Sequence, residues 1–120
     1  MKILVVDDSK AMRSIVIRTL RQAGFDGHVI QEATDGKNAL EVMNSYSPDL
    51  VLTDWNMPEM LGIDLIRAVR AKGNMVPFVF ITSEGTEEIH KVALGEGAKA
   101  VITKPFSAEK FQEKLSGVIQ

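Results

Sequence analysis

Three aspartates stand where buried strands are expected to end. Asp7 and Asp8 follow the apolar run Lys2–Val6, and Asp54 follows the run Leu50–Thr53. Open α/β sheets carry their functional sites at the carboxyl ends of the strands. If the two strands are neighbours, the carboxylates converge, and two charges ~4 Å apart repel by ~4 kcal/mol at an effective dielectric constant near 20. Such a cluster needs a counter-ion, and a set of oxygen ligands favours a hard divalent cation such as Mg²⁺.

Each acidic position also has a purely structural explanation. Aspartate is a favoured helix N-cap, and Ser9 follows the first pair, although two consecutive acids exceed what one cap needs. The segment Asp54–Pro58 has the composition of a polar loop whose proline ends a strand. The chemical interpretation makes Asp54 a nucleophile, because carboxylates form acyl-phosphate intermediates. A neighbouring Mg²⁺ would neutralise charge in that transfer.

Two further strand ends carry polar groups. Lys104 follows the run Ala100–Thr103, and Thr82 ends the run Phe78–Thr82. A lysine at a strand end is usually solvated, but at the same sheet edge as the acids its ammonium can pair with Asp54 or with a phosphoryl oxygen. The Thr82 hydroxyl is a possible donor to a phosphoryl group on the same aspartate. We therefore expect these side chains to meet at one edge.

The elements that must position these residues alternate along the chain. Short apolar or β-branched runs predict strands over Lys2–Val6, His28–Glu32, Leu50–Thr53, Phe78–Thr82 and Ala100–Thr103. Helical periodicity predicts helices over Met12–Leu20, Gly36–Ser45 and Ile63–Val69, a fourth after Thr86, and a fifth from Ser107 through Ile119. Gly24 and Gly73 are expected to end the first and third helices. Asp35, Thr86 and Ser107 are expected to cap the second, fourth and fifth. The second run is the most polar, as an edge strand should be. Strict alternation predicts a three-layer α/β domain with a parallel sheet.

Composition limits the possible functions. A chain of 120 residues with 45% hydrophobic and 25% charged residues is typical of one globular domain. The net charge of −2, without a basic stripe, gives no reason to expect nucleic acid. The apolar runs are too short to span a membrane, and cysteine is absent. The first strand follows Met1 directly, without room for a signal peptide, so we expect a cytoplasmic protein.

The ordered set of Asp7 and Asp8, Asp54, Thr82 and Lys104 resembles the receiver domain of two-component response regulators. The Asp-x-x-Met-Pro loop and the Lys-Pro-Phe sequence strengthen the resemblance, which covers residues 1–120 as one receiver domain. It implies a flavodoxin-like sheet of five strands in the order 2-1-3-4-5, with helices on both faces.

The resemblance also implies a role for the acids. Asp54 would be the phosphoacceptor, attacking the phosphorus of a phosphohistidine on a histidine kinase. Asp8, Asp54 and the backbone carbonyl of Asn56 would bind Mg²⁺, and Asp7 would help through water.

A switch is implied as well. Lys104 would pair with the phosphoryl group, and Thr82 would move to hydrogen-bond it, biasing the face formed by the fourth helix, fifth strand and fifth helix. Receivers usually carry Tyr or Phe three residues before the lysine, and its rotation is coupled to the threonine. That position here is Val101, so the aromatic half of the switch is missing.

Within the family, the chain is most similar to stand-alone chemotaxis regulators. It begins at the first strand and stops at the fifth helix, which predicts a whole, monomeric, single-domain switch. A flagellar motor protein is one candidate for its downstream partner. Asn56 and Glu84 occupy the two positions that tune self-dephosphorylation, which predicts a short-lived phosphoryl state. The alternatives are a phosphorelay intermediate and a receiver excised from a larger regulator.

Two other function classes are weaker. A flavin- or nucleotide-binding module needs glycines or hydroxyls after the first strand to cradle phosphate, whereas two carboxylates stand there. An aspartyl-nucleophile phosphatase or phosphotransferase carries a second acid two residues past the nucleophile as general acid. Asn56 occupies that position and cannot donate a proton in that way. We expect catalysis only of the chain's own phosphorylation and dephosphorylation.

Overall fold

The computed structural model describes residues 1–119 as alternating strands and helices. The elements are β1 (Lys2–Val6), α1 (Lys10–Gln22), β2 (Val29–Ala33), α2 (Gly36–Val42), β3 (Leu50–Asp54), α3 (Gly62–Ala71), β4 (Phe78–Thr82), α4 (Glu87–Gly95), β5 (Ala100–Thr103) and α5 (Ala108–Leu115). All pairings are parallel, and the strand order β2-β1-β3-β4-β5 confirms the predicted flavodoxin-like sheet. Among the described residues, no helix is long and apolar enough to cross a membrane.

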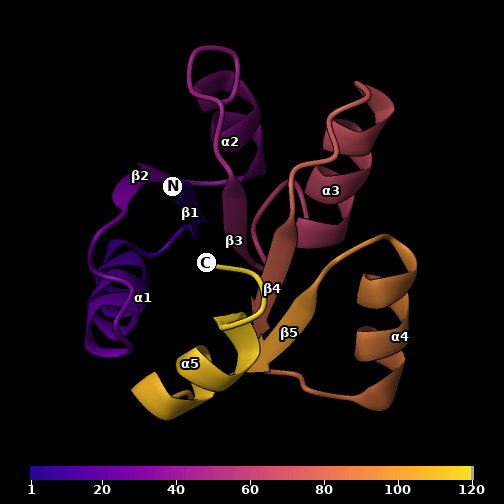
Figure 1. Cartoon of the computed structure of the whole chain (residues 1–120). Coiled ribbons are helices and arrows are strands. Elements are labelled where there is room, and N and C mark those ends of the chain that lie inside the picture. Colours follow the sequence, from indigo (N-terminus) through magenta and orange to yellow (C-terminus); the bar gives the residue numbers. More distant parts are fainter. Residues whose placement is uncertain (120) are drawn as a thin grey trace.

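The helices form a layer on each face of the sheet (Figure 1). Helices α1 and α5 cover one face, where Leu20 and Phe111 pack on alternate strand residues such as Leu52. Helices α2, α3 and α4 cover the other face, where Ile66 packs with Phe80. Because successive strand residues point to opposite faces, both clusters draw on the same central strands, which are therefore apolar on both sides.

Most helix boundaries follow the predicted signals. The side chains of Ser9, Asp35, Thr86 and Ser107 each accept a hydrogen bond from a backbone N–H in the first turn of the helix that follows. These bonds satisfy N–H groups that have no partner within the helix. Gly24 and Gly73, at φ +95° and +79°, follow α1 and α3 in the left-handed conformation that glycine tolerates best.

Several predicted boundaries were wrong by a few residues. Strand β2 begins one residue later than predicted and extends to Ala33, because its parallel register is set by pairing with β1. Helix α2 ends at Val42 rather than Ser45, since the last N–H groups turn to the carbonyl three residues back. The last helix ends at Leu115, although Ile119 beyond it is still buried in the core.

The parallel register places the polar strand ends side by side. Val6 pairs with Thr53, and Thr82 pairs with Thr103, so the residues that follow these strands lie along one edge of the sheet. Strand β3 itself extends to Asp54. At the far end of that edge, the peptide bond between Lys104 and its proline is cis.

Gly62 controls the position of Asp54. It is the first residue of α3, and its N–H donates to the carbonyl of Trp55 at 2.9 Å. A Cβ at this position would lie 2.6 Å from the backbone oxygen of Asp54 and 2.9 Å from the ring of Phe80. Only glycine therefore lets α3 begin this close to the end of β3.

We expect Gly62→Ala to destabilise the fold by about 1–3 kcal/mol, the usual cost of forcing an extra methyl into a packed site. The Asp54 backbone would have to shift, and the fluorescence of the adjacent Trp55 would change with it. Urea unfolding measures the stability. Gly95→Ala is the matched control, because nothing lies within 4 Å of a Cβ there, so it should cost no stability. Equal effects of the two substitutions would contradict this account.

Candidate functional site

The structure brings the three aspartates together at the carboxyl edge of the sheet. One carboxylate oxygen from each of Asp7, Asp8 and Asp54 lies within 4.8 Å of the others. Asp7 and Asp54 are buried, at 4% and 8% exposure, whereas Asp8 is exposed. The convergence expected from the strand ends is therefore present, and it puts two of the three negative charges out of water.

Lys104 lies close to Asp54. Its Nζ is 3.3 Å from Asp54 Oδ1, in a pair whose side chains are only 21% and 10% exposed. Burial raises the pKa of Asp54, as does the nearby charge of Asp8, while the ammonium of Lys104 opposes the shift. Lys104 thus compensates the charge of the carboxylates only in part.

The carboxylate of Asp7 is similarly confined. Its Oδ1 accepts a hydrogen bond from the backbone N–H of Ser9 at 2.8 Å. Burial is the main cause that raises the pKa of this carboxyl. The Ser9 N–H opposes the rise, and the charge of Asp54 adds to it.

A divalent cation would relieve the repulsion among the three carboxylates. Carboxylate oxygens are ligands that Mg²⁺ prefers, so the residues present fit this metal.

Thr82 ends β4, which lies between β3, the strand of Asp54, and β5, the strand that Lys104 follows. Its side chain is fully buried, and its Oγ1 accepts from the N–H of Glu84 at 3.0 Å. Because the oxygen accepts in this bond, the hydroxyl keeps its hydrogen for donation. Glu84 is itself exposed in the loop after β4, as Asn56 is in the loop after β3.

Two buried or half-buried side chains link the site to its surroundings. Trp55, directly after Asp54, packs edge-on against the ring of Phe80, with ring centroids 5.0 Å apart and an interplanar angle of 80°. Val101 is 2% exposed and pairs with Phe80 across β4 and β5. The indole is therefore placed to report on changes at the acid cluster.

Two residues important to the site were not predicted from the sequence. Gly62 sets the approach of α3, and Arg13 donates from Nη1 to the backbone carbonyl of Asp7 at 2.7 Å. A signal for Arg13 existed: it lies three residues before Val16, on the face of the helix predicted to be buried. A charged residue on such a face needs a partner.

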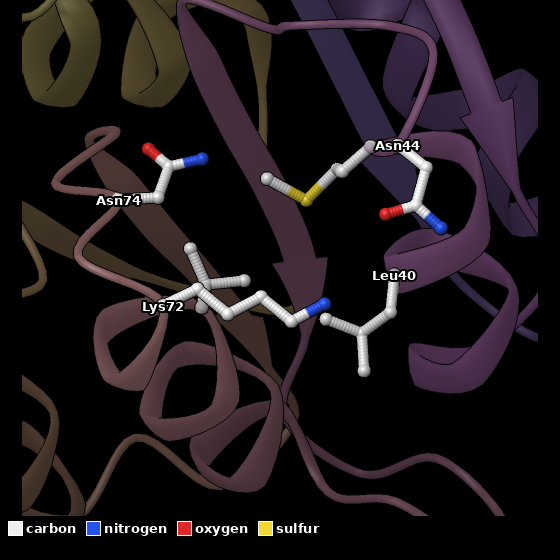
Figure 2. Close-up of a pocket in the computed structure, with 6 residues that line it drawn as sticks. Leu40, Asn44, Lys72 and Asn74 are labelled. Atoms are coloured by element: carbon white, nitrogen blue, oxygen red, sulfur yellow. The ribbon is translucent and has the colours of Figure 1, made fainter.

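Two hollows in the surface of residues 1–119 bear on the location of the site. A groove of about 460 Å³ borders the site and is lined by Met12, Ile15, Ser83, Lys104, Pro105 and Phe106. A smaller cavity of about 210 Å³ lies between the ends of α2 and α3, where Leu40 and Asn44 face Lys72 and Asn74 (Figure 2). The smaller cavity lies at the C-terminal ends of these helices, away from the acids, so it is not part of the candidate site.

The raised pKa of Asp7 has a consequence for stability. Its folded pKa lies above the ordinary 3.8, so the folded state binds this proton more tightly than the unfolded chain, and ionised Asp7 destabilises the fold at neutral pH. We expect Asp7→Asn to raise the Tm of the metal-free protein at neutral pH, since asparagine can still accept from the Ser9 N–H. The gain should shrink as pH falls through the folded pKa, because wild-type Asp7 then becomes neutral.

Thermal unfolding with a chelator present, followed by circular dichroism, measures this difference. The exposed Asp26→Asn is the control and should leave the Tm unchanged. Added Mg²⁺ should stabilise wild type more than Asp7→Asn. A lower Tm for Asp7→Asn in chelator would contradict the electrostatic explanation.

Comparison with known proteins places the chain in a family. Residues 3–116 match the family described as the response regulator receiver domain. The chain is 40% identical to the chemotaxis protein CheY of Pseudomonas aeruginosa, over 100% of this chain and 97% of that protein. It is 43% identical to CheY-3 of Vibrio cholerae, over 100% and 92%. The structure of CheY4 of Vibrio cholerae superimposes with a TM-score of 0.86 at 32% identity, over 98% of each chain. The chain therefore belongs to the receiver-domain family of response regulators.

Proposed function

We propose that this receiver is a single-domain chemotaxis switch, phosphorylated on Asp54 by a histidine kinase in a Mg²⁺-dependent reaction. The observation that carries the proposal is the position of Asp54. It is buried at the end of a central strand, with Lys104 at 3.3 Å and two further carboxylates within 4.8 Å. The similarity to chemotaxis proteins over the full chain supports the biological role.

The proposed metal ligands are Asp8, Asp54 and the backbone carbonyl of Asn56, with Asp7 acting through water. The three carboxylates supply the hard oxygen donors and the uncompensated negative charge that such a site requires. When bound, Mg²⁺ supplies positive charge against the phosphoryl oxygens.

In the proposed reaction, a carboxylate oxygen of Asp54 attacks the phosphorus of the donor phosphohistidine. The new O–P bond forms as the P–N bond breaks, and the electron pair returns to the imidazole nitrogen, which takes up a proton. Lys104 then pairs with an oxygen of the transferred group instead of with the free carboxylate. The distance of 3.3 Å between its Nζ and Asp54 Oδ1 supports this step, because the ammonium already reaches the carboxylate that would carry the group.

The proposed switch uses Thr82, whose buried hydroxyl can donate to a phosphoryl oxygen on Asp54. Movement of Thr82 would shift the loop after β4 and the face formed by α4, β5 and α5, which we propose as the surface for the downstream partner. A flagellar motor protein is one candidate. Val101 is buried and has no ring to rotate, so the loop itself must transmit the change.

In this proposal, the chain catalyses only its own phosphorylation and dephosphorylation. Asn56 and Glu84 are exposed on the loops after β3 and β4, the strands that end at Asp54 and Thr82. We propose that these two residues tune its lifetime.

Trp55 is the single tryptophan and therefore allows a direct test. We expect its fluorescence to change on titration with Mg²⁺, and to change again when acetyl phosphate is added as a small phosphodonor. The second change requires a nucleophile and should be lost in Asp54→Asn. Intact-mass spectrometry should show one added phosphoryl group in wild type and none in the variant.

Lys104→Met provides a second arm of this test, because it removes the ammonium and keeps an apolar stem. It should still bind Mg²⁺ but lose most of the response to the donor. A wild-type protein that fails to respond to Mg²⁺, or an Asp54→Asn variant that responds to the donor like wild type, would refute the site assignment.

The phosphoryl group should be short-lived. After the donor is removed, we expect the fluorescence of Trp55 to return to its starting value within minutes in Mg²⁺, and much more slowly when a chelator removes the metal. Replacing Asn56 and Glu84 should change the rate without abolishing phosphorylation. A phosphorylated protein that persists for hours in Mg²⁺ would contradict this proposal.

A further inference from the structure

Arg13 is a buried cation beside the acid cluster. The residue is 8% exposed, whereas the other arginines of α1, Arg18 and Arg21, are exposed. Its guanidinium makes two contacts in different directions. The Nη1 donates to the backbone carbonyl of Asp7 at 2.7 Å, and the Nε donates to Glu32 of β2 at 2.9 Å. The arginine therefore ties the edge strand to the loop that carries two of the three acids.

The loop from β1 to α1 is short and contains only Asp7, Asp8 and Ser9. Asp7 is held on three sides: its N–H donates to Ala33 at 3.2 Å, its carboxylate accepts from Ser9, and its carbonyl accepts from Arg13. Asp8 is exposed, so its direction depends on the backbone that carries it.

Peptide planarity makes the Arg13 contact important for Asp8. The carbonyl oxygen of Asp7 and the Cα of Asp8 belong to one planar unit, so fixing the oxygen also fixes the Cα from which the Asp8 side chain extends. Rotation of this unit would turn Asp8 away from the other two carboxylates. The charged donor makes the bond stronger than one between neutral groups.

From this geometry we infer that Arg13 is a positioning residue for the metal site: it holds the Asp7–Asp8 peptide so that both carboxylates face a common divalent cation. The inference rests on the proposed Mg²⁺ site, and it assigns a role to Arg13 that does not require contact with metal or phosphoryl group. Glu32 serves to hold the guanidinium in place and is secondary.

The sign of one measurement separates positioning from a simple charge effect. If Arg13 acted only through its charge, its removal would strengthen Mg²⁺ binding, because a cation would no longer repel the metal. If Arg13 positions the peptide, its removal weakens binding despite that gain. Loss of groups that orient metal ligands typically costs about 10–100-fold in affinity, and we expect about tenfold here.

The experiment is a Mg²⁺ titration of wild type, Arg13→Met and Glu32→Gln, followed through Trp55 at about 0.01 M and about 1 M ionic strength, where the screening length falls from ~30 Å to ~3 Å. Methionine keeps the apolar stem of the arginine and removes its charge and donors. We expect Arg13→Met to bind about tenfold more weakly at both ionic strengths. Glu32→Gln should stay close to wild type, because the bond to the Asp7 carbonyl remains.

A metal-free measurement complements the titration. The ¹⁵N-amide resonances of Asp8 and Ser9 should shift in Arg13→Met and stay in place in Glu32→Gln. If Arg13→Met does not fold, the double variant Arg13→Met/Glu32→Gln avoids leaving the glutamate unpaired and carries the same expectation.

Equal or tighter Mg²⁺ binding by Arg13→Met would overturn the inference. A loss in Glu32→Gln as large as in Arg13→Met would overturn it as well, since the ion pair rather than the carbonyl bond would then be responsible. Failure of wild type itself to bind Mg²⁺ would instead refute the proposed metal site, so the two failures are distinguishable.

Discussion

The repulsion among carboxylates at the sheet edge is the constraint on which the site depends. Asp7 and Asp54 are both buried, and Asp8 completes the cluster. A fold can hold like charges out of water only if opposite charge is supplied nearby. The strand order provides it, because Lys104, two strands away from Asp54, reaches back across the intervening strand. Neighbouring strands lie ~4.8 Å apart, so a long lysine side chain after β5 can reach across β4 to the end of β3.

The same strand order sets the position of Thr82. Its strand lies between the strand of Asp54 and the strand that precedes Lys104, so the threonine stands between these two residues along the sheet edge. The three residues lie at or just after the ends of strands that are consecutive in the sheet. Strand order and parallel pairing therefore suffice to bring them to one edge of the sheet.

Much of this arrangement could be predicted from the sequence, because strand ends are marked by abrupt changes from apolar to polar residues. Asp54 and Lys104 each follow such a run and Thr82 ends one, and parallel pairing sends all the ends to one edge. The contacts of Arg13 and Gly62 could not be predicted in the same way. They depend on how far a flexible side chain reaches and on how closely α3 approaches β3, and neither distance is encoded in residue spacing.

The packing of α4 has a consequence for the motions of the domain. Ala93 is the buried residue of this helix, whereas Val92 and Leu94 are 41% and 51% exposed, and the strand residue on the same face is the small Val101. Because α4 buries so little apolar area, its packing on the sheet stabilises it only weakly, and the free energy of its local opening is low. Helix α4, which follows the loop after β4, can thus change its orientation at small energetic cost. The central strands, buried on both faces, stay rigid while it does so.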